Sequence, residues 1–174
     1  MHLLATPAGN LPQGAAVDLA LPPGDILFLT AADSEIALLA AAQRRRLEAD
    51  PAAPTLRLGS LLRLAHNLSV DLLVEKTLPG ARLVVVRLLG GRGYWPYGVD
   101  EIAAACRAEK IPLALLPGDE RADAELAELS TVALQARDRL WNYLREGGPG
   151  NAEGFLESCA ALLGRDTPTR APET

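Results

Sequence analysis

The sequence has few cysteines, few lysines and no long apolar run, and each shortage narrows what the protein is expected to be. Only two cysteines occur in 174 residues, Cys106 and Cys159, and both fall on apolar stripes of helical segments. Thiols so placed indicate small buried side chains in a reducing compartment rather than a disulfide-built scaffold. No run approaches the roughly 20 apolar residues of a membrane helix, and no signal peptide is visible. The sequence therefore predicts a cytoplasmic protein without a membrane partner.

Basic residues are also too few for a nucleic-acid-binding surface. Lysine and arginine number 17 against 22 acidic residues, which gives a net charge of −5. Such a balance argues against nucleic acid as a partner. The only basic run, residues 44–46, closes a predicted helix, where cations are favoured by the negative end of the helix dipole.

What is present is an alternation of short apolar runs and helical patterns. Strands are predicted over residues 2–5, 26–30, 55–58, 82–89 and 112–116. Leu- and Val-rich runs of this length are typical of strands buried on both faces of a parallel sheet. Alternating strands and helices predict an α/β fold, and we expect a doubly wound, flavodoxin-like sheet.

The helical segments lie between the strands and beyond the last of them. Asp33 and Ser34 are predicted to cap one helix and Ser69 a second, and a third pattern covers 98–109. Three further patterns follow, around Leu126, Leu140 and Phe155. We expect one domain over 1–163, with a sheet-forming part (about 1–118) and a helical part (119–163). The polar residues 164–174 are predicted to form a linker or disordered tail.

The most informative stretch is the end of the 82–89 strand and the loop that follows it. The loop contains Gly90 and Gly91 and then brings together Tyr94, Trp95 and Tyr97. Ligands of open α/β sheets bind beyond the carboxyl ends of the strands. Glycines permit positive φ and close backbone approach, and aromatic faces suit a large planar ligand. The loop is therefore a candidate binding site, with packing of the aromatic side chains as a lid as the alternative.

Arg87 lies within the same predicted strand and needs a carboxylate partner, because an unpaired buried charge is costly. That carboxylate could come from the protein, for example Asp33 or Asp71, or from a ligand.

The remaining polar candidates form no complete catalytic set. His66 is placed near the crevice, where it could ligate a metal ion or simply bond to backbone. Asp33 and Asp119 follow strands and could transfer protons or cap helices. Residues 91–96 have Pro96 where a dinucleotide-binding motif has its third glycine, and 147–154 lack the Lys-Ser/Thr pair of a phosphate loop. We therefore predict no catalytic residue and reject both nucleotide sites.

A resemblance adds to this interpretation. Matching segments run in order along the chain: DILFLTAADSE at 25–35, SLLRLAHNLSVD at 60–71, VEKT at 74–77, LVVVRLLGG at 83–91, YWPYG at 94–98, LALLPGD at 113–119, RLWNYLREGG at 139–148 and NAEGFL at 151–156. In these segments the chain resembles the N-terminal region of the large subunit of aerobic, ATP-dependent cobaltochelatase, which is related to the magnesium chelatase large subunit.

The resemblance implies a role in cobalamin biosynthesis. The family inserts Co²⁺ into hydrogenobyrinic acid a,c-diamide, and two smaller partner subunits, one an AAA+ ATPase, use ATP and Mg²⁺. Members are far longer than this chain, so we expect that it cannot chelate cobalt alone and binds no cofactor by itself. The expected contribution is corrinoid binding through Arg87 and the aromatic loop. The alternatives are a docking domain for partner subunits or a cobalt-delivery protein, and an independent small-molecule binding protein.

Overall fold

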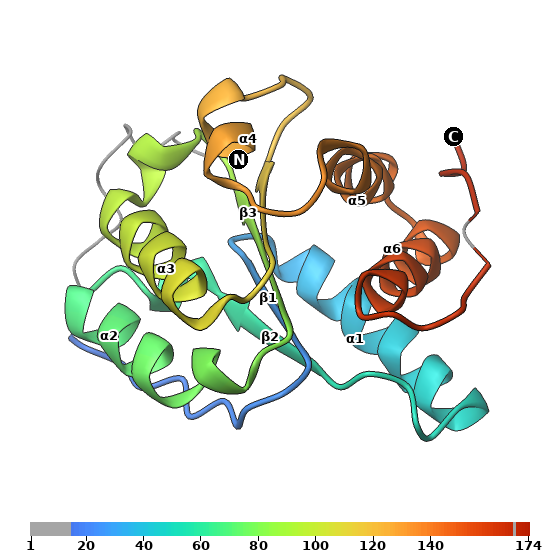
Figure 1. The fold of residues 1–174 in the computed structure, drawn as a ribbon, viewed down its shortest axis with the longest axis horizontal. Coiled ribbons are helices and arrows are strands. Elements are labelled where there is room, and N and C mark those ends of the chain that lie inside the picture. Colours follow the sequence, from blue (N-terminus) through green and yellow to red (C-terminus); the bar gives the residue numbers. More distant parts are fainter. Residues whose placement is uncertain (1–14, 169) are drawn as a thin grey trace, which may run out of the picture.

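The computed structural model describes residues 15–168 and 170–174, and its centre is a four-stranded parallel sheet (Figure 1). The strands are β1 (Ile26–Thr30), β2 (Leu56–Ser60), β3 (Leu83–Leu88) and β4 (Leu113–Pro117), in the order β2-β1-β3-β4. This order is the flavodoxin-like one, so the predicted doubly wound α/β fold is confirmed. Four predicted strands match within two residues, and the one expected at 2–5 lies outside the described residues.

Helices cover both faces of the sheet. They are α1 (Asp33–Ala49), α2 (Asn67–Lys76), α3 (Pro96–Glu109), α4 (Ala124–Leu129), α5 (Leu134–Glu146) and α6 (Pro149–Leu162), with short 3₁₀ turns at Leu61–Arg63, Leu78–Gly80 and Arg92–Tyr94. Figure 1 shows α2 and α3 on one side of the sheet and α1, α5 and α6 on the other. Within the described residues no helix has the length and apolar character needed to cross a membrane.

The two apolar cores follow from the alternation of side chains along the strands. Leu27, Leu29, Val84, Val86 and Leu88 enter the core under α2 and α3. Ile26, Phe28, Leu83 and Val85 enter the second core, under α1, α5 and α6. Every residue of β1 is at most 2% exposed, as the continuous apolar run predicts.

Side chains close the outer edge of β4, where a further strand would otherwise pair. The Leu113 amide donates to Thr131 Oγ1 and the Leu115 amide to Ser130 Oγ, each at 2.9 Å. Arg137 Nε donates to the Leu115 carbonyl, also at 2.9 Å. These bonds satisfy backbone groups that would otherwise template edge-to-edge association.

Two predicted helix caps are wrong. The residue preceding α1 is Ala32, which makes no side-chain cap bond, and Asp33 is already helical. Helix α2 is capped by His66, whose Nδ1 accepts from the Leu68 amide at 3.1 Å. Ser69 lies inside α2, where its buried hydroxyl accepts from the Val17 amide at 2.7 Å. Packing on the sheet fixes where these helices begin, and cap preference alone does not.

Both cysteines are free and buried, which confirms that they act as small apolar side chains. Cys106 is 1% exposed and Cys159 is 0% exposed. Burial raises the pKa of the Cys106 thiol to about 12, and it also raises the pKa of Cys159 far above its ordinary value. Neither thiol is therefore ionised near neutral pH.

Residues 163–168 and 170–174, which follow α6, form neither helix nor strand, and they lie against α5 and α6. The Asn151 side chain donates to the Glu173 carbonyl and accepts from the Glu173 amide, each at 2.8 Å. Arg170 Nη2 lies 3.1 Å from Glu157 Oε1, and the Tyr143 hydroxyl donates to the Arg170 carbonyl. The described part of this predicted tail is thus held by specific hydrogen bonds.

Candidate functional site

The carboxyl ends of β1 and β3 lie side by side, and the chain leaves them toward opposite faces of the sheet. After β1 it enters α1 on one face, and after β3 it enters α3 on the other (Figure 1). Such a switch point is where open α/β sheets bind ligands. A crevice of about 280 Å³ lies here, lined by Thr30, Ala31, Ala32, Glu35, Arg87, Leu89 and Gly118.

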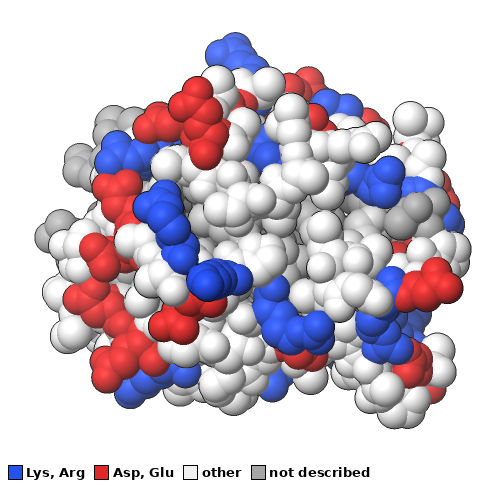
Figure 2. Space-filling model, viewed as in Figure 1, with Lys and Arg blue, Asp and Glu red and all other residues white. Residues whose placement is uncertain are grey.

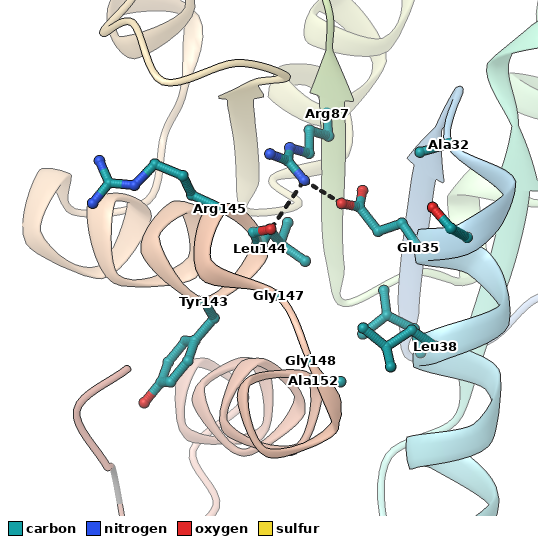
Figure 3. A pocket seen from close by; sticks show the side chains of 12 residues that line it. Ala32, Glu35, Leu38, Arg87, Tyr143, Leu144, Arg145, Gly147, Gly148 and Ala152 are labelled. Carbon is teal, nitrogen blue, oxygen red and sulfur yellow. Dashed lines mark hydrogen bonds and ion pairs between the residues drawn. The ribbon is translucent and has the colours of Figure 1, made fainter. Parts of the chain in front are cut away.

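A larger cavity of about 550 Å³ adjoins this crevice and shares Ala32, Glu35 and Arg87 with it. Its other lining residues come from α1, α5, α6 and the turn between the last two: Ser34, Leu38, Leu39, Tyr143, Leu144, Arg145, Gly147, Gly148 and Ala152. Figure 3 shows the Glu35 and Arg87 side chains meeting at the head of this cavity, with Leu38 and the Gly147–Gly148 turn farther along it. We refer to it as the Arg87 cavity.

Arg87 is paired within the protein. Its Nη1 donates to Glu35 Oε2, and the two side chains are only 12% and 9% exposed. The same guanidinium donates to the carbonyls of Pro117, Leu144 and Gly118 at 3.1, 3.2 and 3.4 Å. The need for a carboxylate was correctly predicted, but neither suggested partner is right. Asp33 is exposed, and Asp71 lies on α2 across the sheet.

Glu35 is only half satisfied by this pairing. Its Oε2 accepts from Arg87, whereas the buried Oε1 has no hydrogen-bond partner among the described residues. A buried acceptor without a donor carries a desolvation cost that a bound group could remove.

Arg145 and the turn between α5 and α6 also line the Arg87 cavity, and the Arg145 side chain points away from Glu35 and Arg87 (Figure 3). The Arg145 guanidinium stacks 5.4 Å from the centre of the Trp141 ring and is 35% exposed. Gly147 and Gly148 have φ of 69° and 87°, and nothing lies within 4 Å of where their Cβ atoms would be. Gly148 precedes α6 and makes no side-chain cap bond. The turn itself is open, whereas the Glu173 carboxylate lies against the first turn of α6 at Gly150.

The aromatic residues of the predicted loop do not join Arg87. Trp95 is 4% exposed, packs in the core beneath α2 and α3, and donates from Nε1 to the Leu64 carbonyl at 2.9 Å. Tyr94 and Tyr97 are partly buried against the same core. The Tyr97 hydroxyl donates to Asp71 at 2.6 Å, and this bond raises the pKa of Tyr97 to about 12. The structure thus divides the predicted site between the two faces of the sheet.

Gly90 and Gly91 both adopt the positive φ that their sequence position suggests, 88° and 68°. They line a third cavity of about 230 Å³ between the ends of β3 and β4, together with Asp119 and Asp123. Asp123 caps α4 by accepting from the Leu126 amide at 3.0 Å. This cavity is separate from the one at Arg87, with which it shares no lining residue.

His66 is engaged as the cap of α2 through Nδ1, the backbone-bonded role considered for it. Asp119 Oδ1 accepts from the Arg121 amide at 3.0 Å, a local turn contact. Within the described part of the chain, no group of three or more His, Cys, Asp or Glu side chains is arranged to hold a metal ion. Metal binding by His66 remains a prediction from the sequence.

Comparison with known proteins then shows what the chain is related to. It is 45% identical over 164 residues to the aerobic cobaltochelatase subunit CobN of a Sinorhizobium species, covering 94% of this chain and 12% of that protein. It is 42% identical over 176 residues to the same subunit of Pseudomonas aeruginosa, covering 99% of the chain and 14% of the relative. The chain is homologous to part of CobN. No family model matches it.

A solved structure supports the relation to CobN at the level of the fold. The catalytic subunit of cobaltochelatase from Mycobacterium tuberculosis superposes with a TM-score of 0.67 and 26% sequence identity. The match covers 87% of this chain and 11% of that structure. The chain thus spans about one eighth of the length of the curated CobN relatives it matches.

Sequence reasoning missed most of the lining of the Arg87 cavity. Glu35 lies in the first turn of α1, directly after β1, where a carboxylate faces the neighbouring strand's end. Gly147 and Gly148 were considered only within residues 147–154, which were rejected as a phosphate loop. The two consecutive glycines before Pro149, close to Arg145, could have indicated a turn with exposed backbone.

Proposed function

We propose that this chain is a domain of a cobaltochelatase large subunit that acts in cobalamin biosynthesis by contacting the corrinoid. The observation that carries the proposal is the 45% identity to CobN over 94% of the chain. The reaction served is insertion of Co²⁺ into hydrogenobyrinic acid a,c-diamide. Two smaller subunits, one an AAA+ ATPase, supply ATP hydrolysis with Mg²⁺, and both cobalt and corrinoid are substrates of the assembly.

The Arg87 cavity supports corrinoid contact. Corrinoids carry amide and carboxylate side chains around an apolar macrocycle, and the cavity offers matching groups. Arg145 supplies a partly exposed cation, the turn before α6 supplies open backbone, and Leu38 supplies apolar surface. A volume of about 550 Å³ suits one edge of a macrocycle rather than the whole ring.

In this proposal the chain binds and orients, and the rest of the large subunit carries the chelation chemistry. We assign no catalytic residue here. Arg87 is a positioning residue, because its bonds join the ends of β3 and β4 to α1 and α5. The isolated chain is expected to bind corrinoid without inserting cobalt.

Tryptophan fluorescence tests the proposal. Trp141 lies under Arg145, a lining residue of the Arg87 cavity, whereas Trp95 lies in the core on the other face. Titration with hydrogenobyrinic acid a,c-diamide should quench emission saturably, and Trp141→Phe should remove most of the quenching. The matched variant Trp95→Phe should retain it. Absence of saturable quenching at high micromolar corrinoid would contradict corrinoid contact by this chain.

A second candidate function is docking of partner subunits or of a cobalt-delivery protein. The observation that favours it is exposed apolar surface in the segments that follow β2 and β3 at the carboxyl edge of the sheet. Leu62, Leu68 and Leu89 are 51%, 48% and 58% exposed. A broad uncharged area also occupies the middle of the face drawn in Figure 2, between groups of charged side chains. Such surfaces suit burial against another protein.

A further inference from the structure

The unpaired Oε1 atom of Glu35 indicates which kind of ligand group would bind in the Arg87 cavity. Oε1 is an acceptor buried beside the cavity, with no partner among the described residues. Arg87 does not supply the missing bond: four of its five N–H groups donate to Glu35 Oε2 and to the carbonyls of Pro117, Leu144 and Gly118, and the fifth makes no bond to Oε1. A group that completes Glu35 Oε1 must be a hydrogen-bond donor, and a ligand in the cavity could supply it.

The charge around the cavity selects among possible donors. An anionic group would meet the Glu35 carboxylate at close range, which is repulsive in a partly buried site. A cationic group would meet the Arg87 guanidinium at the head of the cavity. A neutral donor avoids both costs, and the commonest neutral group with two donors and one acceptor is a primary amide.

We propose that the Arg87 cavity recognises a primary carboxamide, with Glu35 Oε1 accepting from the amide NH₂. The amide oxygen would point toward the open turn at Gly147 and Gly148. Because Oε1 is buried in the unliganded chain, the flexible Glu35 side chain must turn toward the cavity to meet the ligand. Glu35 is thereby a residue that determines specificity for amide over carboxylate.

This inference rests on the proposed function, because it names which peripheral group of a corrinoid the cavity selects. Hydrogenobyrinic acid a,c-diamide and the parent hydrogenobyrinic acid differ only in two amides that replace two carboxylates. Binding of both by the purified full chain is measured by titration calorimetry. We expect the diamide to bind at least about tenfold more tightly, since a hydrogen bond to a charged acceptor is worth that factor or more.

Variants locate the selection at Glu35. Glu35→Gln should reduce the preference for the diamide to less than about threefold, since the amide of glutamine can also donate to a carboxylate. Glu48→Gln, on the exposed far end of the same helix, is the matched control and should keep the wild-type ratio. Should Glu35→Gln fail to fold by circular dichroism, Ser34→Trp obstructs the cavity from an exposed position and should weaken diamide binding at least about tenfold.

The outcomes separate this inference from the function on which it rests. Equal affinity of the wild-type chain for diamide and acid would overturn amide recognition and leave corrinoid contact standing. Wild-type selectivity retained by Glu35→Gln would also overturn it, as would diamide affinity unchanged by Ser34→Trp if the first variant does not fold. Failure of the chain to bind either compound would remove the proposed corrinoid contact, and amide recognition with it.

Discussion

Replacing Arg87 with methionine is expected to lower the free energy of unfolding by about 3–5 kcal/mol, because it leaves the buried Glu35 carboxylate uncompensated. The substitution also removes three hydrogen bonds that Arg87 donates to backbone carbonyls. These belong to Pro117 at the end of β4, to Gly118 just after it, and to Leu144 in the last turn of α5. Urea unfolding followed by circular dichroism measures the loss.

Two variants control this result. Arg82→Met removes an arginine that is 56% exposed just before the same strand, and it should change stability by less than about 1 kcal/mol. Adding Glu35→Met to Arg87→Met should recover part of the loss, because the unpaired charge is then gone. An Arg87→Met chain as stable as the wild type would contradict the structural role of the pair.

Truncating Phe155 to alanine is expected to cost about 3–5 kcal/mol, because it opens a cavity in the core between α6 and the sheet. Phe155 is 0% exposed and meets Phe28 of β1 edge to face, with ring centroids 5.5 Å apart. If the helical part and the sheet form one cooperative domain, unfolding should remain a single transition at a lower urea midpoint.

The matched control is Leu134→Ala on α5, a leucine that is 62% exposed and should cost less than about 1 kcal/mol. A Phe155→Ala chain that unfolds in two separate steps would instead show that α6 folds apart from the sheet. That result would contradict the single domain expected over 1–163.

Strands β1, β3 and β4 were predictable because each is a short apolar run buried on both faces, whereas the edge strand β2 is only partly buried. The beginnings of α1 and α2 were not predictable, because Ala32 and His66 occupy cap positions that their residue types do not favour. Serine is a residue type that favours a cap position, which is why Ser69 was predicted to cap α2. In the fold its hydroxyl instead accepts a hydrogen bond from the Val17 amide, which belongs to a distant segment.

The aromatic loop shows the same limit at the candidate site. Trp95 was expected to wall the crevice, yet its ring lies beneath the first turn of α3. Pro96 is the first residue of that helix, and Gly98 has no side chain, so the ring fits against it where any Cβ would collide. The segment WPYG therefore forms a helix start with a buried tryptophan beneath it. The burial of the ring depends on packing and could not be predicted from the sequence.

The Arg87 cavity was predictable only in part, since its lining comes from segments far apart in the sequence. That Arg87 needs a carboxylate follows from its place in a buried strand. That Glu35 provides it, and that Arg145 and the Gly147–Gly148 turn lie at the same cavity, depends on how α1 and α5 pack on the sheet.

The measurement that tests corrinoid contact most directly is amide chemical-shift mapping of the ¹⁵N-labelled chain during titration with hydrogenobyrinic acid a,c-diamide. We predict saturable shifts that cluster at residues 32–38 and 143–152, the two sides of the Arg87 cavity. Shifts confined to the loops that carry Leu62 and Leu89, or no shifts at saturating corrinoid, would contradict corrinoid binding in this cavity.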